Sequence, residues 1–103
     1  MGTEDDELKR TEELGRRLEE ERTEFILTEL QMATTFLDVA ETTKSASTAV
    51  RNCQNAQKAV DTAKHFLSEN RPLSESARIN IGELLEDLEQ RLALLRRHLL
   101  QGI

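Results

Sequence analysis

The chain has 103 residues, of which 37% are hydrophobic and three are aromatic, and its formal net charge is −6. A chain of this length builds at most one domain, its single cysteine excludes an internal disulfide, and no apolar run is long enough to span a membrane. The acidic balance excludes nucleic acid as the main partner, because phosphate binding needs a basic surface. The acidic start also lacks the apolar core of a secretory signal, so we expect a cytoplasmic protein with neither membrane nor nucleic acid as partner.

Residues 1–24 form an acidic lead with ten acids and five bases, and Met1, Leu8, Leu14 and Leu18 are its only apolar side chains. This composition is close to that of disordered segments. Its Glu, Arg, Lys and Leu residues nevertheless favour a helix, and pairs such as Glu12–Arg16 have the i,i+4 spacing that stabilises one. We expect a helix over 5–24 that frays at its start, with a disordered lead as the alternative.

Three helices are predicted for residues 25–103. The first continues from Phe25 to about Glu41, because apolar residues recur at helical spacing along it: Ile26, Leu30, Ala33, Leu37 and Ala40. The second starts at Ser45 or Ser47, either of which can cap it, and ends near Asn70, before Pro72. Its stripe consists mostly of small side chains: Ala49, Cys53, Ala56, Val60, Ala63 and Leu67.

The third helix begins after Ser74, which is a good N-cap, and Gly102 can end it. Its stripe is dominated by leucine: Ala77, Ile81, Leu84, Leu85, Leu88, Leu92, Leu95 and Leu99. Gly82 lies inside this helix, where a close helix contact would explain it. Short connections make neighbouring helices antiparallel. The sequence therefore predicts an all-α fold, an antiparallel up-down-up three-helix bundle with an extended, acidic first helix.

A second apolar line lies on the first helix: Leu14, Leu18, Phe25, Met32, Phe36 and Val39. A wide face that touches both other helices would account for Met32, Phe36 and Val39. It would not account for Leu14 and Leu18, which lie on the part of the helix that overhangs the bundle. We expect this overhang to pack on another protein or on a second copy, with Leu14, Leu18, Phe25 and Met32 as contacts. A twofold-symmetric homodimer is the default form of self-association.

The sequence shows none of the residue spacings that are typical of a catalytic or metal site. His65 and His98 have no Cys or carboxylate partners at metal-ligand spacing, and Cys53 lies on a predicted buried stripe. A phosphorelay domain usually shows His-x-x-Lys-Gly, whereas Phe66, Leu67, Ser68 and Glu69 follow His65 here. We therefore expect no enzyme, no catalytic residue, no metal and no cofactor.

Two stretches resemble known proteins. Residues 35–43 (TFLDVAETT) and 51–62 (RNCQNAQKAVDT) resemble a group of small, uncharacterised bacterial helical proteins. That resemblance implies a short helical bundle and a polar surface formed by Arg51, Asn52, Asn55, Lys58 and Asp61. The pairing of an Ala-rich helix with a Leu-rich one is also similar to microtubule-interacting-and-trafficking domains and tetratricopeptide hairpins, although the tetratricopeptide Trp, Gly and Tyr landmarks are missing. This second resemblance implies peptide binding between helices.

These observations favour a non-catalytic protein–protein interaction or adaptor module. One alternative is a structural self-associating protein whose long first helix builds a dimer. A phosphorelay component that uses His65 is the other.

Overall fold

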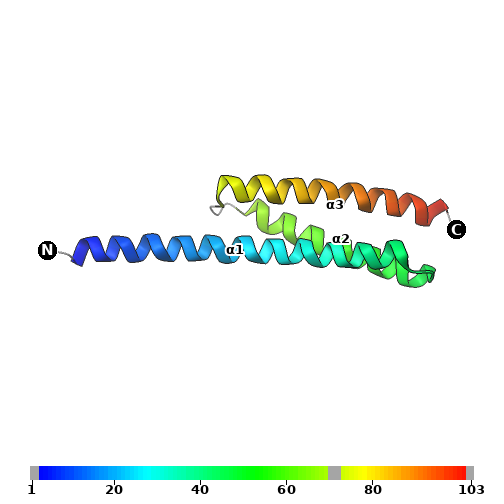
Figure 1. The fold of residues 1–103 in the computed structure, drawn as a ribbon, viewed down its shortest axis with the longest axis horizontal. Coiled ribbons are helices and arrows are strands. Elements are labelled where there is room, and N and C mark those ends of the chain that lie inside the picture. The colour runs from blue at the N-terminus through cyan, green and yellow to red at the C-terminus, as the bar shows by residue number, and fades with distance from the viewer. Residues whose placement is uncertain (1–2, 70–72, 102–103) are drawn as a thin grey trace.

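The computed structural model describes residues 3–69 and 73–101, and within them the fold is all-α without strands. The three helices are α1 (Thr3–Thr42), α2 (Ala46–Ser68) and α3 (Glu75–Gln101). α1 and α3 run in the same direction and α2 returns between them, as the colour sequence in Figure 1 shows. The predicted up-down-up three-helix bundle is therefore confirmed. Asn70, Pro72 and Gly102 lie outside the described residues.

Serine side chains begin the second and third helices, as the sequence predicts. Ser45 has extended backbone geometry, and its Oγ accepts a hydrogen bond from the Thr48 N–H at 3.3 Å. The Ser74 Oγ accepts one from the Ala77 N–H at 3.2 Å. Each cap satisfies one of the backbone donors that a helix leaves unpaired in its first turn, so both helix starts are set locally.

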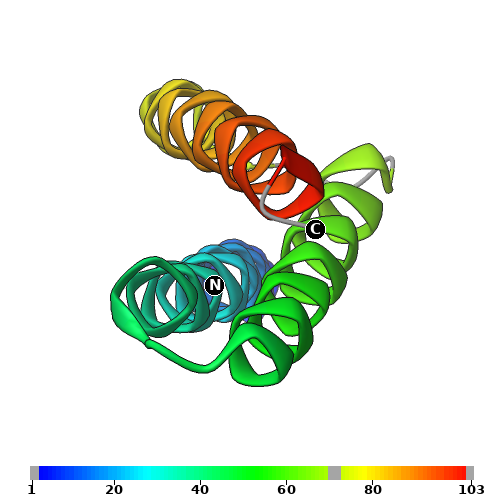
Figure 2. The same ribbon diagram turned by 90° about the vertical axis from the view of Figure 1, so that its right-hand side faces the viewer.

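The three helices surround a common axis when viewed end-on (Figure 2), and the core lies where their apolar stripes meet. All five stripe residues predicted on α1 are buried: Ile26, Leu30, Ala33, Leu37 and Ala40. Opposite them, Ala56 and Ala63 of α2 are fully buried. Such small side chains let two helix axes approach closely, and α1 and α2 indeed share the most extensive contact in the molecule.

Four leucines differ from the predicted core. Leu84 was expected in the α3 stripe but is 43% exposed, and Leu67 and Leu99 are only half-buried. Leu84 lies at the edge of its stripe, and no further helix within residues 3–69 and 73–101 covers that edge. Leu73 was not predicted, and it is buried just before α3 as part of the core.

Polar side chains hold α3 against the other two helices. Arg91 donates hydrogen bonds to Asp38 at 2.8 Å and to Glu41 at 2.6 Å, which ties the middle of α3 to the end of α1. Lys64 of α2 lies 3.4 Å from Glu89 of α3. These contacts position α3 where its direct packing on α1 and α2 is less extensive.

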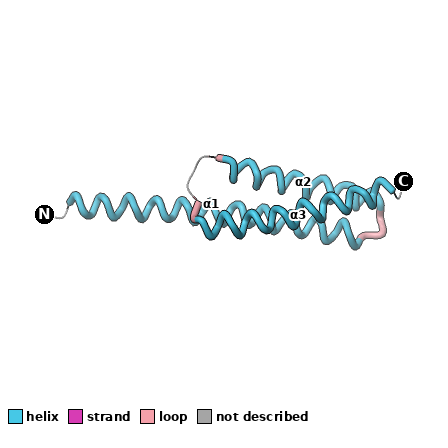
Figure 3. Tube along the Cα trace, turned by 90° about the horizontal axis from the view of Figure 1, so that it is seen from above, coloured by secondary structure: helices cyan, strands magenta, loops and turns pink. Residues whose placement is uncertain are grey.

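α1 extends far beyond the bundle (Figures 1 and 3). Its 40 residues span about 60 Å at 1.5 Å per residue. The molecule measures 72 × 19 × 17 Å, and its radius of gyration of 18.6 Å exceeds the roughly 13 Å of a compact chain of this size. The first buried side chain of α1 is Ile26. We call residues 3–25 the extension. No helix in the described ranges combines the length and the apolar character needed to cross a membrane.

Candidate protein-interaction surface

Four exposed apolar side chains of α1 recur at intervals of seven residues. Leu18 is 54% exposed, Phe25 44%, Met32 44% and Val39 40%. A step of seven residues returns a side chain to within about 20° of the same side of a helix, so these four residues form one line along α1. We call these residues the heptad stripe, and it runs from the extension onto the outer side of the bundle.

The stripe contains most of the predicted contact residues. Leu14 and Leu18 are exposed on the extension, and Met32 is exposed on the bundle. Phe25 is partly used within the chain, because its ring packs on that of Phe66 with centroids 4.7 Å apart and an interplanar angle of 59°. That contact lies where α1 leaves α2, so the stripe passes continuously from the free part of α1 to the packed part.

The expectation that Met32, Phe36 and Val39 complete a wide buried face is right only for Phe36, which packs against the core. Met32 and Val39 stay exposed. The alanine seam lets α2 lie close over the central stripe of α1, so α2 does not reach around to the next line of side chains. The structure thus leaves free a surface that the pattern alone could have assigned to the core.

A shallow hollow of about 270 Å³ opens beside Met32 on the outer side of α1. Its lining is Thr28, Gln31, Met32, Thr35 and Phe36. The first four follow i, i+3, i+4, i+7 spacing, which is how four residues of one helix form a hole for a side chain of a neighbouring helix. The hollow therefore has the shape that helix–helix docking uses.

The five polar residues expected on α2 do not form one cluster. Arg51, Asn55 and Lys58 lie on one line of the helix at i, i+4, i+7 spacing, with Asn55 half-buried and the other two exposed. Asn52 bonds back to its own helix, since its Nδ2 donates to the Thr48 carbonyl at 2.9 Å. Asp61 accepts a hydrogen bond from Gln57 Nε2 at 2.8 Å.

Gln57 also connects Asp61 to α3, because Arg96 of α3 donates a hydrogen bond to Gln57 Oε1. Asp61 therefore belongs to the α2–α3 side of the bundle. The line of Arg51, Asn55 and Lys58 belongs to the α1 side, because Phe66 packs on Phe25 there. α1 and α2 are antiparallel, and these two rings lie at the same height along them. Met32 of α1 is therefore about level with Ala59 of α2, one turn from Asn55. The apolar stripe of α1 and the polar line of α2 thus border the same outer surface.

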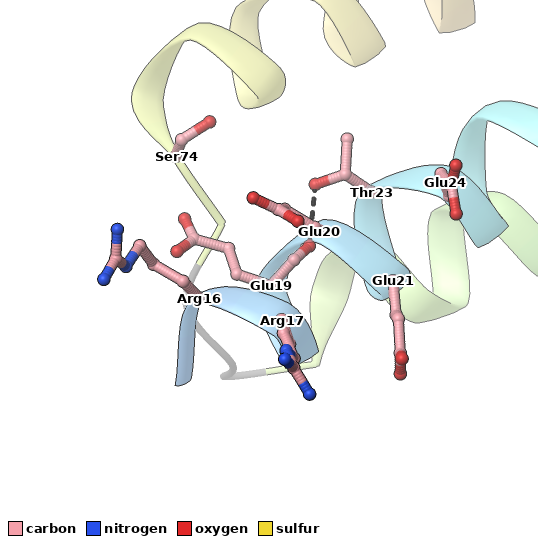
Figure 4. A pocket seen from close by; sticks show the side chains of 8 residues that line it. All are labelled: Arg16, Arg17, Glu19, Glu20, Glu21, Thr23, Glu24 and Ser74. Atoms are coloured by element: carbon pink, nitrogen blue, oxygen red, sulfur yellow. Dashed lines mark hydrogen bonds between the residues drawn. The ribbon is translucent and has the colours of Figure 1, made fainter. Parts of the chain in front are cut away.

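Charged side chains surround the point where the extension leaves the bundle (Figure 4). They line a hollow of about 590 Å³: Arg16, Arg17, Glu19, Glu20, Glu21, Thr23, Glu24 and Ser74. Ser74 caps α3, so these carboxylates lie near the positive end of the α3 dipole and stabilise it. Thr23 bonds only to its own helix, through the Glu19 carbonyl at 2.9 Å. The hollow therefore has a structural explanation.

Other reactive side chains are dispersed. His65 is exposed, with Nε2 3.6 Å from Glu69 Oε1 and its ring edge-on to Phe66 at 5.8 Å. His98 is exposed near the far end of α3, and Cys53 is buried in the core as predicted. Among the described residues, no group of three His, Cys, Asp or Glu side chains could hold a metal ion.

Comparison of the chain with protein-family models, with curated proteins and with solved structures finds no match. The resemblances to small bacterial helical proteins and to peptide-binding hairpins therefore stay predictions from the residues. The geometry of the exposed surfaces is what supports a function. Sequence reasoning overlooked the interval of seven that joins Leu18, Phe25, Met32 and Val39, although it is visible in the sequence.

Proposed function

We propose that the protein is a non-catalytic protein–protein interaction module, an adaptor that binds helical partners along α1. The observation that supports this function best is the heptad stripe, whose four members stay between 40% and 54% exposed on a well-packed helix. Scattered exposed apolar residues are ordinary on protein surfaces, but a regular line of them that spans about 31 Å offers one continuous apolar edge to a partner helix.

The border of the stripe is consistent with this role. Arg51, Asn55 and Lys58 provide a polar rim on α2, and the hollow beside Met32 offers a place for one side chain of a partner helix. Self-association through the same helix is the second candidate. It is favoured by the exposed Leu8, Leu14 and Leu18 on the extension.

Site-specific photo-crosslinking in the producing cell tests the proposal. A photoreactive side chain at Met32 should give one discrete adduct, whereas the same group at Glu86, exposed on α3, should give none. The double variant M32S/V39S, with the crosslinker at Gln31, should lose the adduct that Gln31 gives in the parent chain. Equal adducts from Met32 and Glu86, or no adduct from Met32, would contradict the proposal.

A further inference from the structure

One line of exposed apolar side chains runs along both halves of α1. Leu14 and Leu18 lie on the extension, Met32 and Val39 lie on the bundle, and each is at least 40% exposed. At about 100° per residue, all four lie within about 40° of Phe25 around the helix. Phe25 packs on α2, so the line follows the side of α1 that borders α2. The extension and the bundle therefore present these side chains in the same direction.

The charges beside the two halves of this line have opposite signs. Residues 5–13 of the extension contain five acids and two bases, and Glu7 lies on the line itself, about five full turns before Phe25. Residues 43–60, which lead from the end of α1 into α2, contain three bases and no acid. These bases are Lys44, Arg51 and Lys58, and the last two belong to the polar line that borders the stripe. One half of α1 thus complements the other half in charge.

Two half-buried charges flank the line on the same side, toward α2. Arg22 lies about 60° and Glu29 about 40° from Phe25 around the helix. Within residues 3–69 and 73–101, neither side chain forms an ion pair. They are seven residues apart on one helix, which is too far for them to pair with each other.

A second copy of α1 can lie on this face in a parallel or an antiparallel direction. A parallel pair brings the two acidic starts together and places Arg22 beside Arg22 of the other copy. An antiparallel pair with its twofold axis beside Phe25 places Arg22 level with Glu29 of the second copy, because each lies about 3.5 residues from the axis. A twofold rotation also brings the same flank of both helices together, so these two side chains agree in side as well as in level.

The same axis aligns the apolar side chains of the two helices. Leu18 comes within about 1.5 Å of the level of Met32 of the second copy, and Leu14 falls between the levels of Phe36 and Val39. Phe25 meets Phe25 of the second copy beside the axis. Every exposed apolar residue of the line then faces another apolar residue.

The acidic start of the extension comes beside the bases of the second copy. The Phe25–Phe66 contact sets Arg51 of α2 about level with Ala40 of α1 in one chain. With the axis beside Phe25, Glu7 is level with the α1–α2 turn of the second copy at Lys44, and about one turn from its Arg51. The acids of the extension and the bases of residues 43–60 therefore attract each other only in the antiparallel arrangement.

We propose that the partner of the stripe is a second copy of this chain, whose α1 lies antiparallel on α1 and beside α2. The operation is a twofold rotation, so each copy gives one extension and receives one, and the assembly closes as a dimer. The two α1 helices overlap over residues 9–42, or about 50 Å. The inference rests on the proposed use of α1 as an interaction helix and names its partner.

Sedimentation equilibrium of the full chain tests the dimer directly. We expect a mass of twice 11.8 kDa, and an affinity that falls as salt is added, because the paired charges are partly exposed. The double variant L14S/L18S should be monomeric while its thermal unfolding shows a folded bundle. The control I79S/L94S changes two exposed apolar residues of α3 and should still dimerise. A parent chain that sediments as a monomer over the whole micromolar range would overturn the inference.

A charge exchange tests the pairing of Arg22 with Glu29. R22E alone and E29R alone should each weaken the dimer about tenfold, because the twofold axis turns two attractive pairs into two repulsive ones. The double variant R22E/E29R restores both pairs and should dimerise about as well as the parent chain. The matched control R16E lies half a turn from Phe25 around α1 and should leave the dimer constant unchanged. No recovery in R22E/E29R, or an effect of R16E equal to that of R22E, would overturn the pairing.

Cysteine crosslinking tests the direction of the two helices. An equimolar mixture of L18C and M32C should form an interchain disulfide on oxidation, because Leu18 faces Met32 of the second copy. Either variant alone should form much less, and the native Cys53 does not compete because it is buried. L18C that links to itself more readily than to M32C would overturn the antiparallel arrangement in favour of a parallel one.

The Met32 adduct separates this inference from the proposed function. A monomeric chain whose Met32 adduct contains a different protein retains the adaptor function and overturns the dimer. An adduct of two copies supports the dimer and identifies the helical partner of α1. A chain that gives no Met32 adduct contradicts the proposed function, and it overturns this dimer as well, because Met32 lies in the contact.

Discussion

Arg91 of α3 donates two hydrogen bonds to the same carboxylate oxygen of Glu41 on α1, from Nε at 3.0 Å and from Nη2 at 2.6 Å. Nη2 also donates to Asp38 at 2.8 Å. One arginine thus joins two carboxylates a turn apart on α1, and the planar guanidinium suits this geometry better than a lysine would.

Arg91→Met should destabilise the bundle by about 0.5–1 kcal/mol, because it keeps the apolar stem and removes a partly exposed charge network. Urea unfolding measures the change. Arg97→Met is the matched control, since Arg97 is exposed and the described residues show no ion pair for it. Equal losses in both variants would contradict a specific role for Arg91.

The difference in unfolding free energy between the parent chain and Arg91→Met should be independent of pH near neutrality. The hydrogen bond to Asp38 raises the pKa of Arg91, desolvation opposes this, and the hydrogen bond to Glu41 adds to the increase. A base whose pKa is raised on folding contributes its full stabilisation below its unfolded pKa and loses it only as the pH rises through the folded value. The difference between the parent and Arg91→Met should therefore stay constant from about pH 6 to pH 9. A steady decline within that range would be inconsistent with this assignment.

The Phe25–Phe66 ring contact should stabilise the fold by more than the burial of its apolar area alone would. A double-mutant cycle with Phe25→Leu and Phe66→Leu should give a coupling of about 0.5–1.5 kcal/mol in unfolding free energy. Leucine keeps the apolar surface, so the coupling reports the ring pair. Strict additivity of the two substitutions would show that the contact at 4.7 Å contributes nothing specific.

The alanine seam of α2 should not accept a larger side chain. Ala56 is fully buried, so Ala56→Leu forces α1 and α2 apart and should cost about 1–3 kcal/mol. Ala93→Leu makes the same change at an exposed position of α3 and should alter stability by less than about 0.5 kcal/mol. Thermal unfolding of both variants checks the contrast, and a tolerated leucine at position 56 would contradict close packing of the two helices.

Gly82 has open space around it, contrary to the close contact that its position in a helix suggested. A Cβ placed there meets no other heavy atom within 4 Å. Gly82→Ala should therefore stabilise the protein by about 0.5–1 kcal/mol through helix propensity alone. Chemical unfolding gives the value. A loss of stability would reveal a neighbour, such as a partner chain, that approaches this side of α3.

Local signals predicted the helices well, and long-range geometry explains what they could not predict. Ser45 and Ser74 are caps that act within three residues, and the period of Ile26, Leu30 and Ala33 reflects one face of one helix, so both are readable from the sequence. Whether Val39 or Leu84 is covered depends on how closely the neighbouring helices approach and on how many there are. The Arg91 contacts join residues 50 and 53 positions apart, and a single sequence contains no local signal for such a pair.

α1 continues without a break from the extension into the core. The number of residues in α1 therefore decides toward which side of the helix the side chains of the extension point. Each residue inserted near Glu24 would advance the extension by 1.5 Å and rotate it by about 100° around the helix axis. One added residue would therefore turn Leu14 and Leu18 toward a different side of the rod, whereas seven would return them to within about 20° of their present bearing. Variants of this protein should consequently tolerate changes in helix length in steps close to seven residues and lose the use of the extension at most other lengths.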